Sequence, residues 1–256
     1  RHEAAKMMRL IEAEARETAD RKAKEIIARL SDLSRKNTSL TFQYVSPDEL
    51  VRMIRQAARA EKPDALIIGE VWEDASCKEA YGEHRQYLMG HELDSVMNYP
   101  FANAVIDFVR TANAENLREC VENIVEHYPR ASLDTLMNHI GTHDTVRALT
   151  RLGRGDVPRP KNGRDRGIMT DEQYKKGVEL LMLASVLQFT LPGVPCVYYG
   201  DEAGLSGGED PFNRACFPWG HENKKLLEHY KTLGRISSAP HLSTASSTAY
   251  RRLSAA

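Results

Sequence analysis

The stretch Ala65-Leu66-Ile67-Ile68-Gly69-Glu70-Val71-Trp72-Glu73 joins a short apolar run to a carboxylate at its C-terminal end. An apolar run of this length is typical of a strand buried on both faces of a parallel sheet. In α/β barrels, the groups that act on a substrate lie at the C-terminal ends of the strands. The stretch therefore predicts a barrel strand that presents Glu70 to a functional site.

Two later stretches place acids in the same way. One is Met137-Asn138-His139-Ile140-Gly141-Thr142-His143-Asp144, and the other is Gly193-Val194-Pro195-Cys196-Val197-Tyr198-Tyr199-Gly200-Asp201-Glu202. From residue 47 onward, short apolar segments alternate with helical patterns, which predicts repeated βα units of the α/β class. We expect strands near residues 65–70, 95–98, 135–139 and 196–199, and helices near residues 48–60, 102–111, 114–128, from about 145, 171–190 and 222–236.

Two further segments complete a family resemblance: Leu93-Asp94-Ser95-Val96-Met97-Asn98-Tyr99-Pro100-Phe101 and Gly207-Gly208-Glu209-Asp210-Pro211-Phe212-Asn213-Arg214-Ala215-Cys216-Phe217-Pro218-Trp219. Together the segments closely resemble the α-amylase superfamily of α-glucan-active glycoside hydrolases, and most of all its neopullulanase- and cyclomaltodextrinase-like members. The resemblance runs from about Pro47 to about Pro240. It implies the last four βα units of a (β/α)8 TIM barrel, here preceded by a long N-terminal α-helix.

The resemblance implies retaining hydrolysis or transfer at an α-1,4 or α-1,6 glucosidic bond of an α-glucan oligosaccharide or polysaccharide. One carboxyl group protonates the leaving oxygen, and a second, about 5 to 5.5 Å away, attacks the anomeric carbon. Glu70 matches the general acid/base, and Asp144 matches the third acid, which holds sugar hydroxyls. The resemblance also implies substrate contacts for His143, Trp72 and Asn98, and loop-shaping roles for Asp201, Glu202, Asp210 and Arg214.

The His143-Asp144 pair has two other interpretations. Asp144 precedes a predicted helix, so it could cap that helix. The same dipeptide occurs in metal-dependent phosphohydrolases, with His127 and His139 upstream, but that chemistry needs the pair on a helix among further ligands. The preceding residues read as strand and turn, which disfavours a metal site. No cofactor is expected, and a need for calcium stays open because the family's calcium sites often lie in the first half of the barrel.

The nucleophile of the family is missing from its expected place. The family takes it from an Arg-x-Asp segment on the strand before the acid/base strand, which falls near Thr41 with the Arg near Ser39. Neither residue can serve, although residues 40–45 still suit a strand. We therefore expect a fragment that is inactive alone. The alternative is a non-catalytic helical oligomerisation or interaction protein that carries a barrel remnant.

Residues 1–37 differ in composition from the rest of the chain. They are rich in Ala, Glu, Lys and Arg and contain no Gly or Pro, which predicts a continuous helix of coiled-coil type. Their sequence resembles the coiled-coil region of ribonuclease Y, although any charged, Ala-rich helix would look similar. The predicted domains are thus this helix, a partial barrel over 38–240, and a tail over 241–256 that is disordered or begins a C-terminal β domain.

Composition sets the expected partners. The chain has 256 residues and a formal net charge of −1, which gives no electrostatic reason to expect nucleic acid or an anionic membrane. The four cysteines show no spacing typical of zinc sites or disulfide frameworks. No apolar run is long enough for a membrane span, and no secretory signal is seen, so the expected location is cytoplasmic. Because a partial barrel leaves sheet edges unpaired, we expect a homodimer through the N-terminal helix or the open edges.

Overall fold

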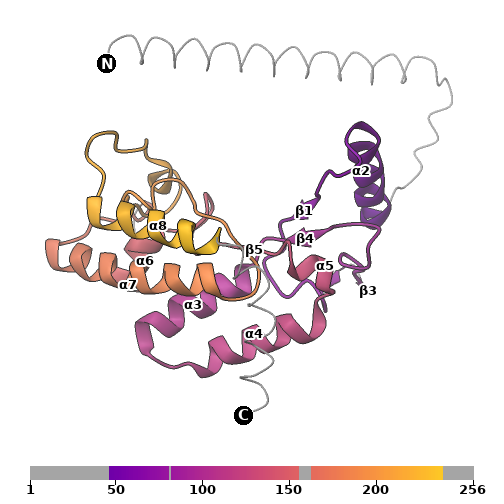
Figure 1. The fold of residues 1–256 in the computed structure, drawn as a ribbon, viewed down its shortest axis with the longest axis horizontal. Coiled ribbons are helices and arrows are strands. Elements are labelled where there is room, and N and C mark those ends of the chain that lie inside the picture. Colours follow the sequence, from indigo (N-terminus) through magenta and orange to yellow (C-terminus); the bar gives the residue numbers. More distant parts are fainter. Residues whose placement is uncertain (1–45, 81, 156–162, 239–256) are drawn as a thin grey trace, which may run out of the picture. The chain divides into compact units, whose positions relative to one another are not determined.

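The computed structural model describes residues 46–80, 82–155 and 163–238 (Figure 1). Nearly all of these residues belong to the unit that begins at Pro47. The helix predicted over residues 1–37, the strand predicted near 40–45 and the tail 241–256 lie outside the described residues. The predicted domain boundaries therefore stay predictions.

Four short parallel strands form the centre of the described part: β1 (Ile68–Gly69), β4 (Ser95–Val96), β5 (Met137–Asn138) and β6 (Val194–Pro195). Strand β1 pairs with β4, and β5 pairs with β6, both in parallel. A parallel bridge between Met97 and Met137 joins the two pairs. The spatial order thus follows the chain order, as predicted for consecutive βα units, and the described part is of the α/β class.

The strands are shorter than the apolar runs predict, and the last one is displaced. The prediction of a strand at 196–199 was wrong, because β6 ends at Pro195. The Cys196 N–H still donates to the carbonyl of Asn138, so the chain continues beside β5 for one more residue. The carbonyl of Tyr199, however, accepts from the Arg147 guanidinium rather than from a strand. The Arg147 side chain, not a neighbouring strand, therefore bonds the backbone at Tyr199.

A small hairpin between β1 and β4 was not predicted. It pairs β2 (Glu79–Ala80) with β3 (Glu83–His84) in antiparallel register. Gly82 in its turn has φ +77°, a conformation that favours glycine. The strands carry charged residues rather than an apolar alternation, so the sequence contains no period-two pattern to reveal them.

The longer helices lie close to their predicted positions. Helices α2 (Pro47–Glu61), α4 (Glu115–His127) and α7 (Asp171–Thr190) confirm the predictions within one residue at every boundary. No helix within the described ranges is long and apolar enough to cross a membrane. The remaining helical segments are α3 (Tyr99–Thr111), α5 (Arg130–Leu133), α6 (Ala148–Arg154), the 3-10 turn η1 (Phe212–Arg214) and α8 (Lys224–Ser237), of which α5 and η1 were not predicted.

Two helix starts differ from the predictions by three residues, and each has a local cause. Helix α3 begins three residues early, because the Asn98 side chain accepts a hydrogen bond from the Phe101 N–H and Pro100 suits the first turn. Helix α6 begins at Ala148 rather than near residue 145. The Arg147 N–H donates to the carbonyl of Gly207, and Arg147 stays extended, so the helix starts one residue later.

The core lies where α3, α6 and α7 pack together (Figure 1). A capping box between Thr170 and Gln173 starts α7. Helices α6 and α7 approach closely at Gly153, where an added Cβ would lie 2.2 Å from the carbonyl oxygen of Gln173. Glycine is therefore required at this crossing. The fully buried core side chains include Ile106, Leu136, Leu149, Leu152, Leu181 and Leu226.

Helix α2 is attached to the rest of its unit by charge. Arg52 pairs with Glu92 at 3.0 Å, while Arg55 and Arg59 pair with Asp94 at 2.7 and 2.8 Å. Arg55 is the one buried residue of this helix, so no apolar side chain of α2 is fully buried. The polar face of α2 therefore points inward, and its apolar face points outward.

Candidate active site

Glu70 follows β1 directly and is exposed at the C-terminal end of that strand. The Tyr99 hydroxyl donates a 2.8 Å hydrogen bond to its Oε1 atom. Tyr99 itself is only 2% exposed, and burial raises its pKa to about 12, with the Glu70 carboxylate adding to the rise. The phenol therefore keeps its proton at neutral pH and remains a donor to Glu70.

Aromatic rings surround this hydrogen bond. The Trp72 ring stacks on Tyr99 with 3.9 Å between the ring centroids, and Trp72 is 49% exposed. The His139 ring meets Tyr99 edge-on at 4.6 Å. Sequence reasoning missed Tyr99, although its place just beyond β4 is the strand-end position that singled out Glu70. An exposed ring beside an acid offers a flat surface on which a sugar can stack.

Asp144 lies on the loop between β5 and α6, and both its carboxylate oxygens are engaged. His143 Nε2 is 3.2 Å from Oδ2, and Arg214 Nη2 donates to Oδ1 at 3.0 Å. The Arg214 Nε atom is in turn 3.0 Å from Asp210 Oδ1. The predicted loop residue Arg214 therefore joins the predicted third acid to Asp210, which sequence spacing alone did not indicate.

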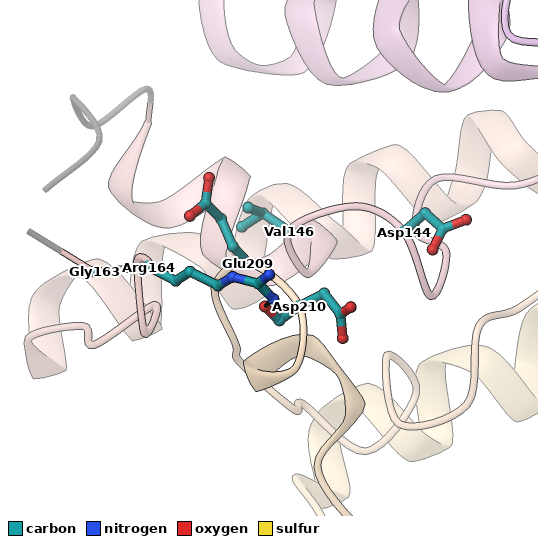
Figure 2. Close-up of a pocket in the computed structure, with 6 residues that line it drawn as sticks. All are labelled: Asp144, Val146, Gly163, Arg164, Glu209 and Asp210. Atoms are coloured by element: carbon teal, nitrogen blue, oxygen red, sulfur yellow. Dashed lines mark hydrogen bonds between the residues drawn. The ribbon is translucent and has the colours of Figure 1, made fainter.

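A pocket of about 530 Å³ opens beside Asp144 (Figure 2). Figure 2 shows Arg164 and Asp210 close together in it, and the Arg164 guanidinium donates to the Asp210 carbonyl. Glu70 does not line this pocket, so the hollow belongs to the Asp144 side of the site. Its lining residues are Asp144, Val146, Gly163, Arg164, Glu209 and Asp210.

Asn98 lies inside the molecule rather than on the surface that a substrate would meet. Its Nδ2 donates to Asn138 Oδ1 at 2.8 Å, and its Oδ1 accepts from the Phe101 N–H. Asn138 Nδ2 continues the chain of bonds to the carbonyl of Pro192 at 2.8 Å. The predicted substrate contact of Asn98 stays a prediction, while the structure shows that it ties β4 to β5 and starts α3.

The acids after β6 have structural surroundings. Asp201 is buried against Arg147, with 3.2 Å between Oδ1 and Nη1. Burial raises the pKa of Asp201 to about 7, and the Arg147 charge opposes that rise. Glu202 accepts the Gly200 N–H at 2.8 Å. Sequence reasoning missed Arg147, which also donates to the carbonyl of Asn213 at 2.9 Å and so joins the two loops.

The other interpretations of His143-Asp144 can be compared with this geometry. Arg147, not Asp144, is the N-cap of α6, so helix capping does not explain Asp144. The pair lies on a loop, whereas a phosphohydrolase needs it on a helix. The described ranges contain no cluster of three or more His, Cys, Asp or Glu that could hold a metal ion. His139 is buried, and burial lowers its pKa to about 4, so it is neutral at pH 7.

Comparisons with known proteins agree with the resemblance. The family "Alpha amylase, catalytic domain" matches residues 23–233, a range that begins within the predicted N-terminal helix. An amylopullulanase of Thermoanaerobacter thermohydrosulfuricus is 38% identical over 194 residues, which is 71% of this chain and 12% of that protein. A cyclomaltodextrinase of a Bacillus species is 36% identical over 192 residues, which is 73% of this chain and 29% of that protein.

The fold agrees as well. The solved structure of the cyclic alpha-maltosyl-(1→6)-maltose hydrolase from Arthrobacter globiformis has a TM-score of 0.62 and 26% identity, over 80% of this chain and 40% of that one. The chain thus spans less than half the length of each protein compared. With the matched family covering most of its residues, this chain belongs to the α-amylase catalytic-domain family.

Proposed function

We propose that this chain carries the proton-donating part of a retaining α-glucan hydrolase. The observation that supports this most is the surroundings of Glu70, an exposed carboxyl group at a strand end that accepts a 2.8 Å hydrogen bond from a buried tyrosine. In this proposal Glu70 donates its proton to the glycosidic oxygen as the bond to the leaving sugar breaks. Tyr99 orients the carboxyl group, and Trp72 stacks against a sugar ring.

Asp144 takes the second role. Its carboxylate, held by His143 and Arg214, is placed to accept hydrogen bonds from sugar hydroxyls. Such contacts favour the distorted ring of the oxocarbenium-like transition state. Because Arg214 also pairs with Asp210, the loop after β6 and the loop after β5 would move together when a substrate binds. In this proposal the bond that is cleaved is the α-1,4 or α-1,6 glucosidic bond that the family resemblance implies.

The chain alone is proposed to be inactive, because the residues that should supply the nucleophile and its arginine are Thr41 and Ser39. A hydroxyl without an activating base cannot replace the carboxylate that forms the covalent intermediate. Purified chain should therefore hydrolyse neither maltooligosaccharide, cyclomaltodextrin nor pullulan above background, as measured by release of reducing sugar. Turnover by the chain alone that Glu70→Gln abolishes would contradict this proposal.

Adding the missing half of the site tests the positive part of the proposal. A second polypeptide that carries the first four βα units of a family member, with its Asp nucleophile, should restore hydrolysis when mixed with this chain. Glu70→Gln should then lower kcat by several orders of magnitude, as removal of a catalytic acid does. Glu73→Gln is the matched control, since Glu73 is exposed three residues away and pairs only with Lys78 among the ion pairs described. Equal loss in both variants would refute the role of Glu70.

The alternative is a module that binds glucan without cleaving it. The exposed rings of Trp72 and Trp219 favour this alternative, because both can stack on sugars. Calorimetric titration of maltooligosaccharide into Glu70→Gln and Trp72→Ala separates the two. Binding that needs Trp72, combined with no activity in the mixed sample, would favour the binding module over the enzyme.

A further inference from the structure

A buried side chain of η1 holds the turn that carries Asp144. Asn213 lies in η1 and is 0% exposed. Its Nδ2 atom donates to the carbonyl of His143 at 2.6 Å and to the carbonyl of Thr145 at 2.9 Å. These two carbonyls belong to the residues on either side of Asp144. An amide nitrogen has two N–H donors, so this side chain fixes the backbone both before and after the acid.

The residue that follows Asn213 holds the same acid by its carboxylate. Arg214 Nη2 donates to Asp144 Oδ1 at 3.0 Å. Within the turn itself, the Thr142 hydroxyl accepts from the Asp144 N–H, and the Thr142 carbonyl accepts from the Thr145 N–H. These local bonds shape the turn of residues 142–145. Asn213 and Arg214 connect it, through backbone and side chain, to η1.

The position of η1 is itself fixed. The fully buried Arg147 donates from Nε to the carbonyl of Asn213 at 2.9 Å. The backbone of Gly207 lies against η1, because an added Cβ there would be 2.3 Å from the carbonyl oxygen of Phe212. Gly207 in turn accepts from the Arg147 N–H and donates to the Thr150 hydroxyl at 2.9 Å. Asn213 therefore donates from a place that the start of α6 determines.

The chemistry of asparagine matters at this position. The two groups that face Asn213 Nδ2 are carbonyl oxygens, which only accept, so the NH2 group and not the oxygen must point at them. Aspartate has the same shape but no N–H to offer. The Asn213 Oδ1 atom is buried without a hydrogen-bond partner in the described structure, which costs stability. Proteins accept such local costs mostly at functional sites.

We propose that Asn213 is a positioning residue for Asp144, which sets where this carboxylate meets the sugar hydroxyls of an α-glucan. The role of Asn213 rests on the proposed function, in which Asp144 binds those hydroxyls. A shift of about 1 Å in a group that contacts the transition state lowers the rate by up to about a hundredfold. Since these contacts strengthen in the transition state, loss of Asn213 should lower kcat more than it changes KM.

Amide hydrogen exchange on the full chain tests the hold on the turn without any need for catalysis. In Asn213→Asp, exchange in residues 142–145 should become about tenfold faster, because the turn loses two hydrogen bonds. Asn213→Ala should act in the same way without adding a charge, and circular dichroism shows that each variant is folded. Exchange in α4 should not change.

Asn103→Ala is the matched control for this measurement. Asn103 is also an asparagine that bonds another helix, but it is exposed and its partner is Arg151, at 3.2 Å. The control should leave exchange in residues 142–145 as it is. Unchanged exchange there in the Asn213 variants, or the same acceleration in the control, would overturn the proposal.

A double-mutant cycle in the mixed sample with the first four βα units tests the link to Asp144. Asn213→Ala should lower kcat by about tenfold to a hundredfold. In a chain that already carries Asp144→Asn, it should change kcat by less than about threefold, because residues that act as a unit are not additive. The same factor in both backgrounds would show a merely structural role and overturn the proposal. A mixed sample that is inactive with unaltered chain would refute the proposed function, and the exchange result would then decide on Asn213.

Discussion

At the residue scale, Asp201 and His139 show how burial acts in opposite directions on an acid and a base. Burial raises the pKa of Asp201 to about 7 and lowers that of His139 to about 4. Both ring nitrogens of His139 and the Asp201 Oδ2 atom are buried without a hydrogen-bond partner in the described structure. Both residues therefore tie the free energy of unfolding to pH.

Asp201→Asn should reveal the first of these effects. The folded chain binds this proton more tightly than the unfolded chain does, so Asp201 lowers the free energy of unfolding as pH rises from about 4 to about 7. The variant lacks this loss, and its stability relative to the native chain should rise over that window by on the order of a few kcal/mol. Urea unfolding at pH 5 and pH 8 gives the comparison. A constant difference between the two pH values would show that Asp201 does not titrate there.

His139→Leu should show the opposite dependence. Unfolded histidine gains its proton near pH 6.5, whereas folded His139 gains it only near pH 4. The native chain therefore loses stability as pH falls through this window, and the variant should gain relative to it. Leucine leaves no buried nitrogen unpaired, so the cost at pH 7 should be small. Parallel urea curves for the native chain and the variant at every pH would contradict this.

At the element scale, two helices can approach closely where a glycine leaves room between them. Helices α6 and α7 approach at Gly153, and a Cβ there would also lie 2.5 Å from the Met169 Cε atom. In α8, by contrast, a Cβ on Gly234 would meet no atom within 4 Å. Glycine is thus required for close packing in α6, whereas α8 has room for a larger side chain at Gly234. The amino-acid sequence does not distinguish these cases, since both glycines interrupt helical patterns.

Alanine at these two positions makes a matched pair. Gly153→Ala should lower the free energy of unfolding by about 1 to 3 kcal/mol, because α6 and α7 must separate. Gly234→Ala should instead raise it by roughly 0.5 to 1 kcal/mol, because alanine restricts the unfolded chain more. Midpoints of urea unfolding measure both. Equal effects of the two substitutions would show that the α6–α7 contact is looser than described.

At the scale of the whole described unit, different parts are held together by different interactions. The helices α3, α6 and α7 share an apolar core, whereas α2 is held mainly by arginine pairs to Glu92 and Asp94. Burial would raise the pKa of Asp94, but the hydrogen bonds from Arg55 and the Ile67 N–H, together with the charges of Arg55 and Arg59, outweigh burial and the pKa is lowered. The paired carboxylate thus stabilises the fold above pH 4, and this contribution is lost as pH falls further.

Asp94→Asn should therefore loosen α2 without unfolding the core. We expect amide hydrogen exchange in residues 47–61 to become at least tenfold faster, because two arginines lose their partner and one is buried. Exchange in α7 should not change. Asp134→Asn is the control, since its pair with Arg130 lies on the surface. Uniform acceleration in α2 and α7 would mean that α2 and the core unfold together.

The class of the fold, the long helices and the family follow from the amino-acid sequence alone. Helices α2, α4 and α7 follow from the helical patterns between the apolar runs, and Glu70 and Asp144 follow from apolar runs that end in acids. These features are local, so a single stretch of chain contains the information. The hairpin of β2 and β3, with its charged strands, had no such local pattern.

Which side chains meet, in contrast, follows from the folded arrangement of the elements. Tyr99 reaches Glu70 across 29 positions, and Arg214 reaches Asp144 across 70. Arg147 bonds the Tyr199 carbonyl 52 positions away, beyond the end of β6. Such contacts depend on the packing of whole elements, which no spacing along the chain expresses. The strand-end acids could be predicted because each directly follows its strand in the sequence. Their partners come from other strands and loops, which are distant in the sequence.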